Sequence, residues 1–238
     1  MSKKLMQLYF NLIYMPLYDH TTAQTSPYQR LQRECIGKLQ FEGGESVLCV
    51  GVGTGSEMLS ILGKSNGVRI TGIDKSPQAL RRACRKALKR GNKITAMQMD
   101  AHRLEFADES FDKLFCVHVM GFLEDDRTAT REAMRVLKKG GQYVITYPSG
   151  SGSIELTREI THNIWRDLKR GRLLKAARQC FATAAAGMVY IPGASWVKPR
   201  KGFYSQKNLE DMLNELGFRG YCIEEDRAYQ DIIVYGKK

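Results

Sequence analysis

The sequence lacks several patterns that would each assign it to a familiar class of protein. No apolar run approaches the roughly 20 residues that a membrane-spanning helix needs. The six cysteines are scattered, with no CxxC pair, which argues against both a disulfide framework and a zinc site. Internal repeats and low-complexity segments are absent as well. We therefore expect a globular cytoplasmic protein with reduced, mostly buried thiols and no metal site.

The amino-terminal stretch, MSKKLMQLYFNLIYM, has two lysines ahead of an apolar segment, as a signal peptide does. Gln7 and Asn11 interrupt this segment, and no cleavage site made of small residues follows it. The pattern therefore favours a retained amphipathic helix over residues 3–15.

The charge is strongly basic, with 37 lysines and arginines against 25 acidic residues and a net charge of +12. Basic faces attract polyanions such as nucleic acid or anionic lipid headgroups, although a solvated helix surface gives the same pattern. The basic residues form two groups, one of Lys75, Arg81, Arg82, Arg85, Lys86, Lys89, Arg90 and Lys93, the other of Arg158, Arg166, Lys169, Arg170, Arg172, Lys175 and Arg178.

Short apolar segments typical of buried strands alternate along most of the chain with segments whose apolar residues recur at helical spacing. This rhythm predicts an α/β, Rossmann-like, doubly wound sheet with helices on both faces. A helical, basic insert of residues 150–200 follows the fifth strand, and the last two strands, joined by a short turn, must be antiparallel. We expect seven strands, at residues 47–50, 68–73, 94–99, 113–117, 143–147, 221–225 and 231–235, and helices at 26–40, 56–62, 77–90, 126–137 and 206–216.

The stretch VLCVGVGTGS places Gly51, Gly53 and Gly55 directly after the first strand and before a helix. A glycine-rich turn of this kind lets a ligand approach backbone N–H groups at a helix amino terminus, although glycines also serve tight turns. The spacing is GxGxG, and Ser56 stands where the dinucleotide fingerprint GxGxxG needs its third glycine.

Acidic residues follow the second and third strands, at Asp74 in GIDKSPQAL and at Asp100 in MQMDAHRLEF. A carboxylate can accept hydrogen bonds from both hydroxyls of a ribose, or from an exocyclic amine. Each aspartate could instead cap the following helix. Together the two acids favour an adenosine-bearing cofactor without a pyrophosphate.

The motifs VLCVGVGTGS, GIDKSPQAL, MQMDAHRLEFADESFD, KLFCVHVMGFLEDD and EAMRVLKKGGQYVITYP resemble, in order and spacing, those of class I S-adenosylmethionine-dependent methyltransferases. Within this class the sequence resembles the methyltransferases of ubiquinone and menaquinone synthesis and related small-molecule or lipid enzymes. The segment LIYMPLYDH is similar to the Tyr-Asp segment that precedes their core. The resemblance implies one domain, 1–238, divided into a helical cap (1–40), a cofactor-binding core (41–148), a helical lid or substrate insert (150–200), and a helix with the terminal hairpin (203–238).

The resemblance also implies roles for individual residues around S-adenosylmethionine. The three glycines would line its methionine and ribose portion, Asp74 would bind the ribose, and Lys75, Asp100 and Ala101 would lie at the adenine. Val117 would offer its carbonyl near the cofactor's amino group, with His118 beside it, and Tyr18 would close over the cofactor. Cys49 departs from the family, which usually has an acid there, so the contact to the methionine ammonium is in doubt.

A general base would help if the acceptor is a phenol, an enol or a ring carbon. His118 is the best candidate, with His20 and His102 behind it, because an unperturbed imidazole titrates near neutrality. A packing role for His118, or a reaction that uses no base, would fit the sequence equally well. No NPPY or DPPY motif follows the fourth strand, which lowers the case for a DNA adenine acceptor.

Apolar stripes in the amino-terminal segment and in the insert favour a hydrophobic small-molecule acceptor, such as a quinone precursor, isoprenoid, polyketide or lipid. Trp165 beside basic residues would also suit the surface of an anionic inner membrane. Three alternatives stay open: an RNA or protein methyltransferase that uses the basic faces, a non-catalytic cofactor-binding protein, and, at a distance, a NAD-dependent oxidoreductase. The oligomeric state is left open.

Overall fold

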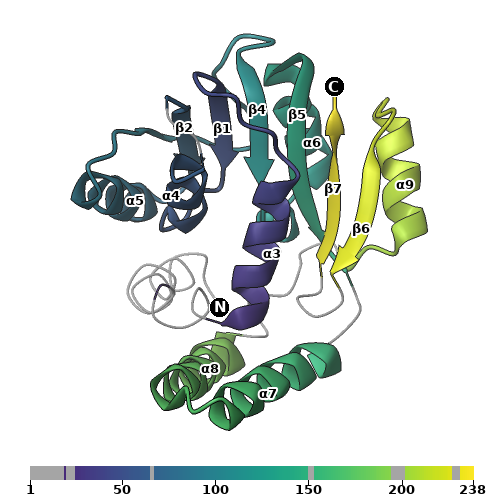
Figure 1. The fold of residues 1–238 in the computed structure, drawn as a ribbon. Helices are drawn as coiled ribbons and strands as arrows, with labels where there is room; N and C mark the ends of the chain where they lie inside the picture. The colour runs from purple at the N-terminus through teal and green to yellow at the C-terminus, as the bar shows by residue number, and fades with distance from the viewer. Residues whose placement is uncertain (1–18, 20–24, 65–66, 150–152, 194–201, 227–230) are drawn as a thin grey trace.

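The computed structural model describes residues 19, 25–64, 67–149, 153–193, 202–226 and 231–238 of the chain (Figure 1). The helix predicted over residues 3–15, together with Tyr18 and His20, lies outside the described residues. Within the described part, no helix is both long and apolar enough to cross a membrane. No cluster of three or more His, Cys, Asp or Glu residues there could hold a metal ion.

Seven strands form one sheet in the order β3-β2-β1-β4-β5-β7-β6 (Figure 1). β1, β2, β3, β4 and β5 run parallel, whereas β7 pairs antiparallel with both β5 and β6. The predicted fold class, including the terminal antiparallel hairpin, is confirmed. The strands are β1 (Ser46–Val50), β2 (Arg69–Asp74), β3 (Thr95–Gln98), β4 (Phe111–Cys116), β5 (Leu137–Pro148), β6 (Cys222–Asp226) and β7 (Asp231–Lys237).

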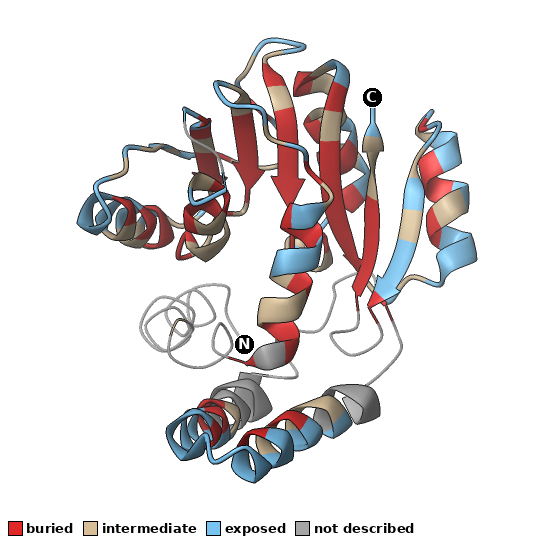
Figure 2. Cartoon of the chain, in the orientation of Figure 1, coloured by how far each residue is buried: buried red, intermediate tan, exposed pale blue. Residues whose placement is uncertain are grey.

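Helices cover both faces of the sheet, because the inner strands are apolar on both sides. From β1, Leu48 and Val50 pack on the face covered by α6 (Asp126–Val136) and α9 (Gln206–Glu215). Val47 and Cys49 point to the opposite face. That face is covered by α3 (Ser26–Gly37), α4 (Ser56–Leu62) and α5 (Pro77–Lys89), and Figure 2 shows the buried strands between the two layers.

Side-chain caps fix where several helices begin. The Ser76 hydroxyl accepts a hydrogen bond from the Ala79 N–H, and Pro77 occupies the first position of α5, as the sequence predicted. Ser205 caps α9 in the same way. The helix predicted over 126–137 ends at Val136, and Leu137 already belongs to β5, since it pairs with Phe111 of β4. A short 3-10 helix, η3 (Met120–Phe122), was not predicted.

The helical insert expected after β5 forms two helices, α7 (Ser153–Lys169) and α8 (Leu173–Gly193). Gly171 adopts φ 68° in the turn between them, a left-handed conformation that ends α7. The helix pair lies beyond the carboxyl ends of the parallel strands (Figure 1). Arg30 of α3 connects it to the core, because its guanidinium lies 2.8 Å from Glu159 of α7 and 2.8 Å from Asp226 of β6.

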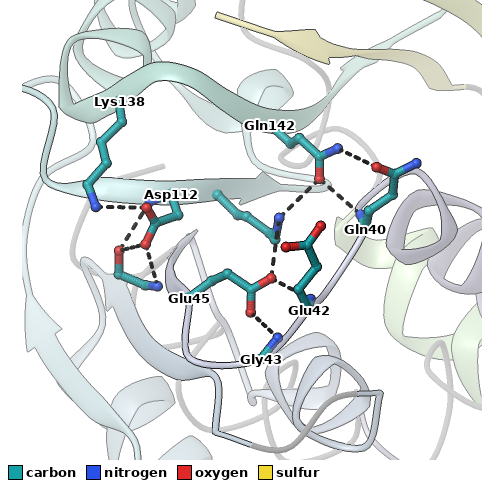
Figure 3. Close-up of polar contacts among 9 residues, drawn as sticks. Gln40, Glu42, Gly43, Glu45, Asp112, Lys138 and Gln142 are labelled. Atoms are coloured by element: carbon teal, nitrogen blue, oxygen red, sulfur yellow. Dashed lines mark hydrogen bonds and ion pairs between the residues drawn. The ribbon is translucent and has the colours of Figure 1, made fainter.

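The opposite, amino-terminal edge of the sheet is closed by polar contacts within the protein (Figure 3). The carboxylate of Asp112 accepts from both the backbone N–H and the hydroxyl of Ser46, at 2.8 and 2.6 Å, and lies 2.7 Å from Nζ of Lys138. Gln142 bridges Gln40 and Lys113. These contacts fix the register at the edge that lies away from the candidate site.

Candidate functional site at the carboxyl edge of the sheet

The carboxyl ends of the parallel strands bring four sequence motifs to one edge. Gly51 follows β1, Asp74 ends β2, Asp100 follows β3, and Val117 follows β4. Because these strands are neighbours in the order β3-β2-β1-β4, the motifs lie side by side. The chain leaves β1 toward β2 on one side and reaches β4 on the other, so β1 lies at the switch point where ligands bind in open α/β sheets.

The three glycines of the turn after β1 have positive φ angles of 65°, 50° and 82°, but their surroundings differ. A Cβ on Gly51 would lie 2.3 Å from Cγ2 of Val119, and a Cβ on Gly55 would lie 2.8 Å from Cβ of Ala83. These two glycines therefore allow close packing within the protein. At Gly53, by contrast, an added Cβ would meet no described heavy atom within 4 Å. Of the three, Gly53 is the position where a ligand can approach the backbone.

Asp74 connects this turn to the end of β2. One carboxylate oxygen accepts from the Gly53 N–H at 2.8 Å, and the other accepts from the Ser76 N–H at 2.8 Å. Burial raises the pKa of Asp74, and the backbone N–H groups counteract part of that shift. A carboxylate has about four lone-pair positions, so both oxygens can still accept a hydroxyl. Asp74 is thus held rigidly and keeps the capacity to bind a vicinal diol beside Gly53.

Asp100 is already engaged with side chains of this protein. Nζ of Lys75 lies 2.8 Å from one oxygen, and the backbone N–H of His102 donates to the other at 3.0 Å. These hydrogen bonds, with Lys75 the largest contributor, lower the pKa of Asp100. Lys75 thus forms an ion pair with Asp100, and its predicted position beside the adenine stays a prediction. Ala101 is half-buried and packs against the core on the side of α6.

The ring of His102 bridges two backbone segments and is held in one orientation. Nδ1 lies 2.6 Å from the Asp100 carboxylate, and Nε2 lies 3.2 Å from the Asp125 backbone nitrogen, whose N–H donates to it. This pair of partners selects the tautomer with the proton on Nδ1. His102 therefore has a structural role, which disfavours it as a general base.

Cys49 lies in the interior of β1, where the family usually has an acid. Its side chain is buried, and burial raises the pKa of the thiol to about 12. The thiol is therefore neutral at physiological pH and supplies no negative charge to a bound ammonium group. β1 therefore has no acidic side chain at the position where the family usually holds the methionine ammonium.

Two other carboxylates gather at the amino terminus of α4, next to the glycine turn. Glu57 lies in the first turn of α4, accepts a hydrogen bond from the hydroxyl of Tyr28, and has its pKa raised to about 7 by burial. Asp19 accepts from the Thr54 hydroxyl at 2.6 Å and pairs with Lys86. Sequence analysis missed Glu57, although a charged residue within the apolar helix SEMLSIL was a usable signal.

His118 follows β4 with φ 58°, an unusual conformation for a residue other than glycine. Its backbone N–H donates to the Thr146 hydroxyl at 3.0 Å, and its ring stacks on Tyr28 with centroids 5.6 Å apart. Burial lowers the pKa of His118 to about 4, below the near-neutral value assumed from the sequence. The imidazole is therefore neutral at physiological pH. Val117, directly before it, is buried.

Asp231 faces His118 from the first residue of β7, a contact that sequence analysis did not find. Its Oδ2 lies 3.3 Å from Nε2 of His118, and burial raises the pKa of its carboxyl group. The antiparallel register places Asp231 opposite Pro148, at the same edge as the end of β4. Since burial disfavours charge on both groups, the pair favours a state without net charge.

Comparison with known proteins identifies the central segment of the chain. Residues 48–145 match the methyltransferase domain family. A phosphatidylethanolamine N-methyltransferase of Cereibacter sphaeroides is 36% identical over 131 residues, which cover 54% of this chain and 62% of the relative. A demethylmenaquinone methyltransferase of Tropheryma whipplei is 35% identical over 130 residues, covering 54% and 53%. The chain thus spans about half the length of the curated relatives that it matches.

Solved structures agree on the fold. A Thermotoga maritima methyltransferase, described as a possible histamine N-methyltransferase, covers 96% of this chain and of its own length, with a TM-score of 0.59 and 20% identity. A putative S-adenosylmethionine-dependent methyltransferase of Methanococcus maripaludis has a TM-score of 0.59 and 19% identity, covering 99% of this chain and 91% of its own. At these identities the likeness concerns the fold alone.

The central segment, residues 48–145, therefore matches a methyltransferase domain family, in agreement with the class I S-adenosylmethionine-dependent family expected from the sequence. S-adenosylmethionine is the cofactor of this family, as expected. The open backbone at Gly53 and the remaining acceptor capacity of Asp74 fit its adenosyl portion. The roles of individual residues stay predictions, and that of Tyr18 lies outside the described residues.

Proposed function

We propose that this protein transfers a methyl group from S-adenosylmethionine to a lipophilic small molecule, such as a quinone precursor, isoprenoid, polyketide or lipid. The observation that carries the proposal is the position of Gly53 and Asp74 at the switch point of a methyltransferase domain. The relatives support the acceptor class, because their names include lipid, quinone and polyketide-type methyltransferases.

The chemistry divides unequally between cofactor and protein. S-adenosylmethionine, when bound, supplies an electrophilic methyl group, which leaves the protein mainly the tasks of positioning and of excluding water. Asp74 would hold the ribose hydroxyls beside the Gly53 backbone, and Asp100 would accept from the adenine amine if the Lys75 ion pair yields. The α7–α8 pair beyond the strand ends would cover the acceptor.

The acceptor's proton would pass to His118. The imidazole is neutral, so its nitrogen can accept a proton. The Asp231 carboxyl group, 3.3 Å away, would stabilise the imidazolium in its ionised form, which burial disfavours. A pKa of about 4 makes the ring a weak base. His118 is thus the proposed catalytic residue, and Asp231 a positioning residue.

Calorimetry with S-adenosylhomocysteine tests the assignment of Asp74. Asp74→Asn keeps the shape of the side chain but removes its charge and one acceptor oxygen, so affinity should fall by about 1.5–3 kcal/mol. Asp112→Asn is a matched control, because Asp112 also accepts a backbone N–H but lies at the opposite edge of the sheet. Equal affinity of Asp74→Asn and the wild type would contradict the proposal.

A transfer assay tests the acceptor class. The protein is incubated with methyl-labelled S-adenosylmethionine and, in parallel, with a lipid extract, total RNA or a protein fraction. Label in the organic phase supports the proposal. Label in RNA or protein would establish the alternative that uses the basic faces. Cofactor binding without transfer to any fraction would favour a non-catalytic protein, the possibility that Cys49 keeps open.

A further inference from the structure

The α7–α8 pair exposes large apolar side chains that the methyltransferase core leaves uncovered. Nine large apolar side chains are exposed among the described residues, and five of them lie on these two helices. Single exposed apolar residues are common on protein surfaces, but their concentration on one hairpin marks an interaction surface. The five, with their exposed fractions, are Trp165 (58%), Leu168 (41%), Leu173 (66%), Leu174 (75%) and Phe181 (68%).

The three leucines among these five residues lie at the turn between the two helices, which we call the hairpin tip (residues 168–175). α7 ends at Lys169 and α8 begins at Leu173, so Leu168, Leu173 and Leu174 flank the turn. In Figure 2 the tip is pale blue throughout, and the buried residues of the two helices lie outside it. The tip thus exposes its apolar side chains.

A buried carboxylate makes the tip rigid. Asp167 accepts the Arg172 backbone N–H through its carbonyl oxygen at 2.9 Å. Its carboxylate lies 3.6 Å from the Arg172 guanidinium and 3.4 Å from Nζ of Lys175, and its side chain is only 2% exposed. These contacts connect the two helices across the turn, and the leucines are already exposed without a partner.

The charge around these apolar residues is positive. Residues 158–185 contain seven basic and two acidic residues. Both acids are engaged within the protein, Glu159 with Arg30 and Asp167 with the tip itself. Nζ of Lys169 lies 5.4 Å from the ring centroid of Trp165, an arrangement that suits a boundary between apolar and aqueous layers. Basic residues close to an anionic bilayer strengthen binding through electrostatic attraction to the headgroups.

We propose that the tip of the α7–α8 hairpin binds the surface of an anionic phospholipid bilayer, inserting Leu173 and Leu174 while the surrounding lysines and arginines contact the headgroups. Exposed leucines give no advantage with a free polyanion such as RNA, and cations give none with a neutral apolar partner. The combination fits a surface that is anionic outside and apolar beneath. This inference does not rest on the proposed methyl transfer, because membrane contact needs neither cofactor nor acceptor.

Vesicle flotation of the full-length protein tests the proposal. Wild-type protein should float with vesicles made of equal parts phosphatidylcholine and phosphatidylglycerol, and much less with phosphatidylcholine alone. The double variant Leu173→Ser, Leu174→Ser should partition roughly 10-fold less, because two apolar side chains no longer enter the bilayer. Both leucines are exposed, so its thermal unfolding and its affinity for S-adenosylhomocysteine should match the wild type.

Leu88→Ser is the matched control. Leu88 is 74% exposed and lies on α5, a helix that is also basic, but far along the chain from the tip. It should partition like the wild type. The proposal is overturned if wild-type protein ignores the anionic vesicles, or if the double variant partitions like the wild type. It is also overturned if Leu88→Ser loses as much as the double variant, or if wild type and double variant bind RNA homopolymer equally and vesicles not at all.

Discussion

Replacing Gly53 with alanine separates the two reasons for which a glycine can stand in the turn after β1. Gly53 has φ 50°, which alanine adopts at a cost of about 1–2 kcal/mol. An added Cβ meets no described heavy atom within 4 Å, so no clash within the protein adds to this cost. For a chain of this size the free energy of unfolding should fall enough to lower Tm by about 2–8 °C.

The same methyl group projects into the space assigned to the cofactor. Overpacking of a close-fitting site costs about 1–3 kcal/mol, so affinity for S-adenosylhomocysteine should fall roughly 10-fold or more. Gly140→Ala is the matched control, because Gly140 has φ 75° and nothing within 4 Å but lies within β5, just before the regular pairing with β4 resumes at Gln142. It should lose similar stability and keep full affinity.

The measurement combines calorimetric titration of the cofactor product with thermal unfolding of the same three proteins. Loss of affinity in Gly53→Ala alone supports the site. If Gly53→Ala binds as tightly as Gly140→Ala, the open side of Gly53 does not face the cofactor, and the assignment of the turn is wrong.

Two further predictions concern the buried titratable groups. Glu57→Gln should raise the free energy of unfolding at pH 8 but hardly at pH 4. Folding raises the pKa of Glu57 from 4.5 to about 7, so the wild type loses up to about 3 kcal/mol of stability as the pH rises between these values. Glutamine does not ionise and removes this loss. Unfolding at both pH values checks it, and an equal effect at each would contradict it. His118→Gln should lower kcat by about 100-fold or more if the ring accepts the proton, with cofactor affinity unchanged. A near-native kcat would leave His118 only its packing on Tyr28.

Much of the fold follows from local sequence signals. Ser76 with Pro77 predicted the start of α5, and the short connection before Asp231 predicted the antiparallel pair at the end of the sheet. Element boundaries that depend on strand pairing were harder to predict from the sequence. β5 begins at Leu137 because that residue pairs with Phe111 of β4, a contact invisible to helical periodicity, which extended the preceding helix by one residue.

The candidate site divides in the same way. Asp74 and Gly53 could be predicted, because each lies at a strand end whose position follows from the motif. The contact between His118 and Asp231 could not, since it depends on the register of β7 against β5. The sequence offered one hint of this contact, because Asp231 is an acid at the start of the otherwise apolar stretch DIIV. Likewise, sequence analysis placed Lys75 and Asp100 together at the adenine but did not predict that they form an ion pair with each other.

The distribution of charge connects the site to the surface. The protein carries a net charge of +12, yet carboxyl groups from Asp19, Glu57 and Asp74 gather around the glycine turn. The Cys49 thiol is neutral and offers no charge to a bound ammonium group. Glu57, in the first turn of α4, can supply that charge. Its pKa lies near 7, and an adjacent ammonium would lower the pKa and so ionise the carboxyl group. These carboxyl groups would attract a cationic cofactor, while the basic hairpin outside would attract the anionic surface proposed above. The two attractions act on different ligands and need not oppose each other, because a Debye length of about 8 Å screens exposed charges from the buried site.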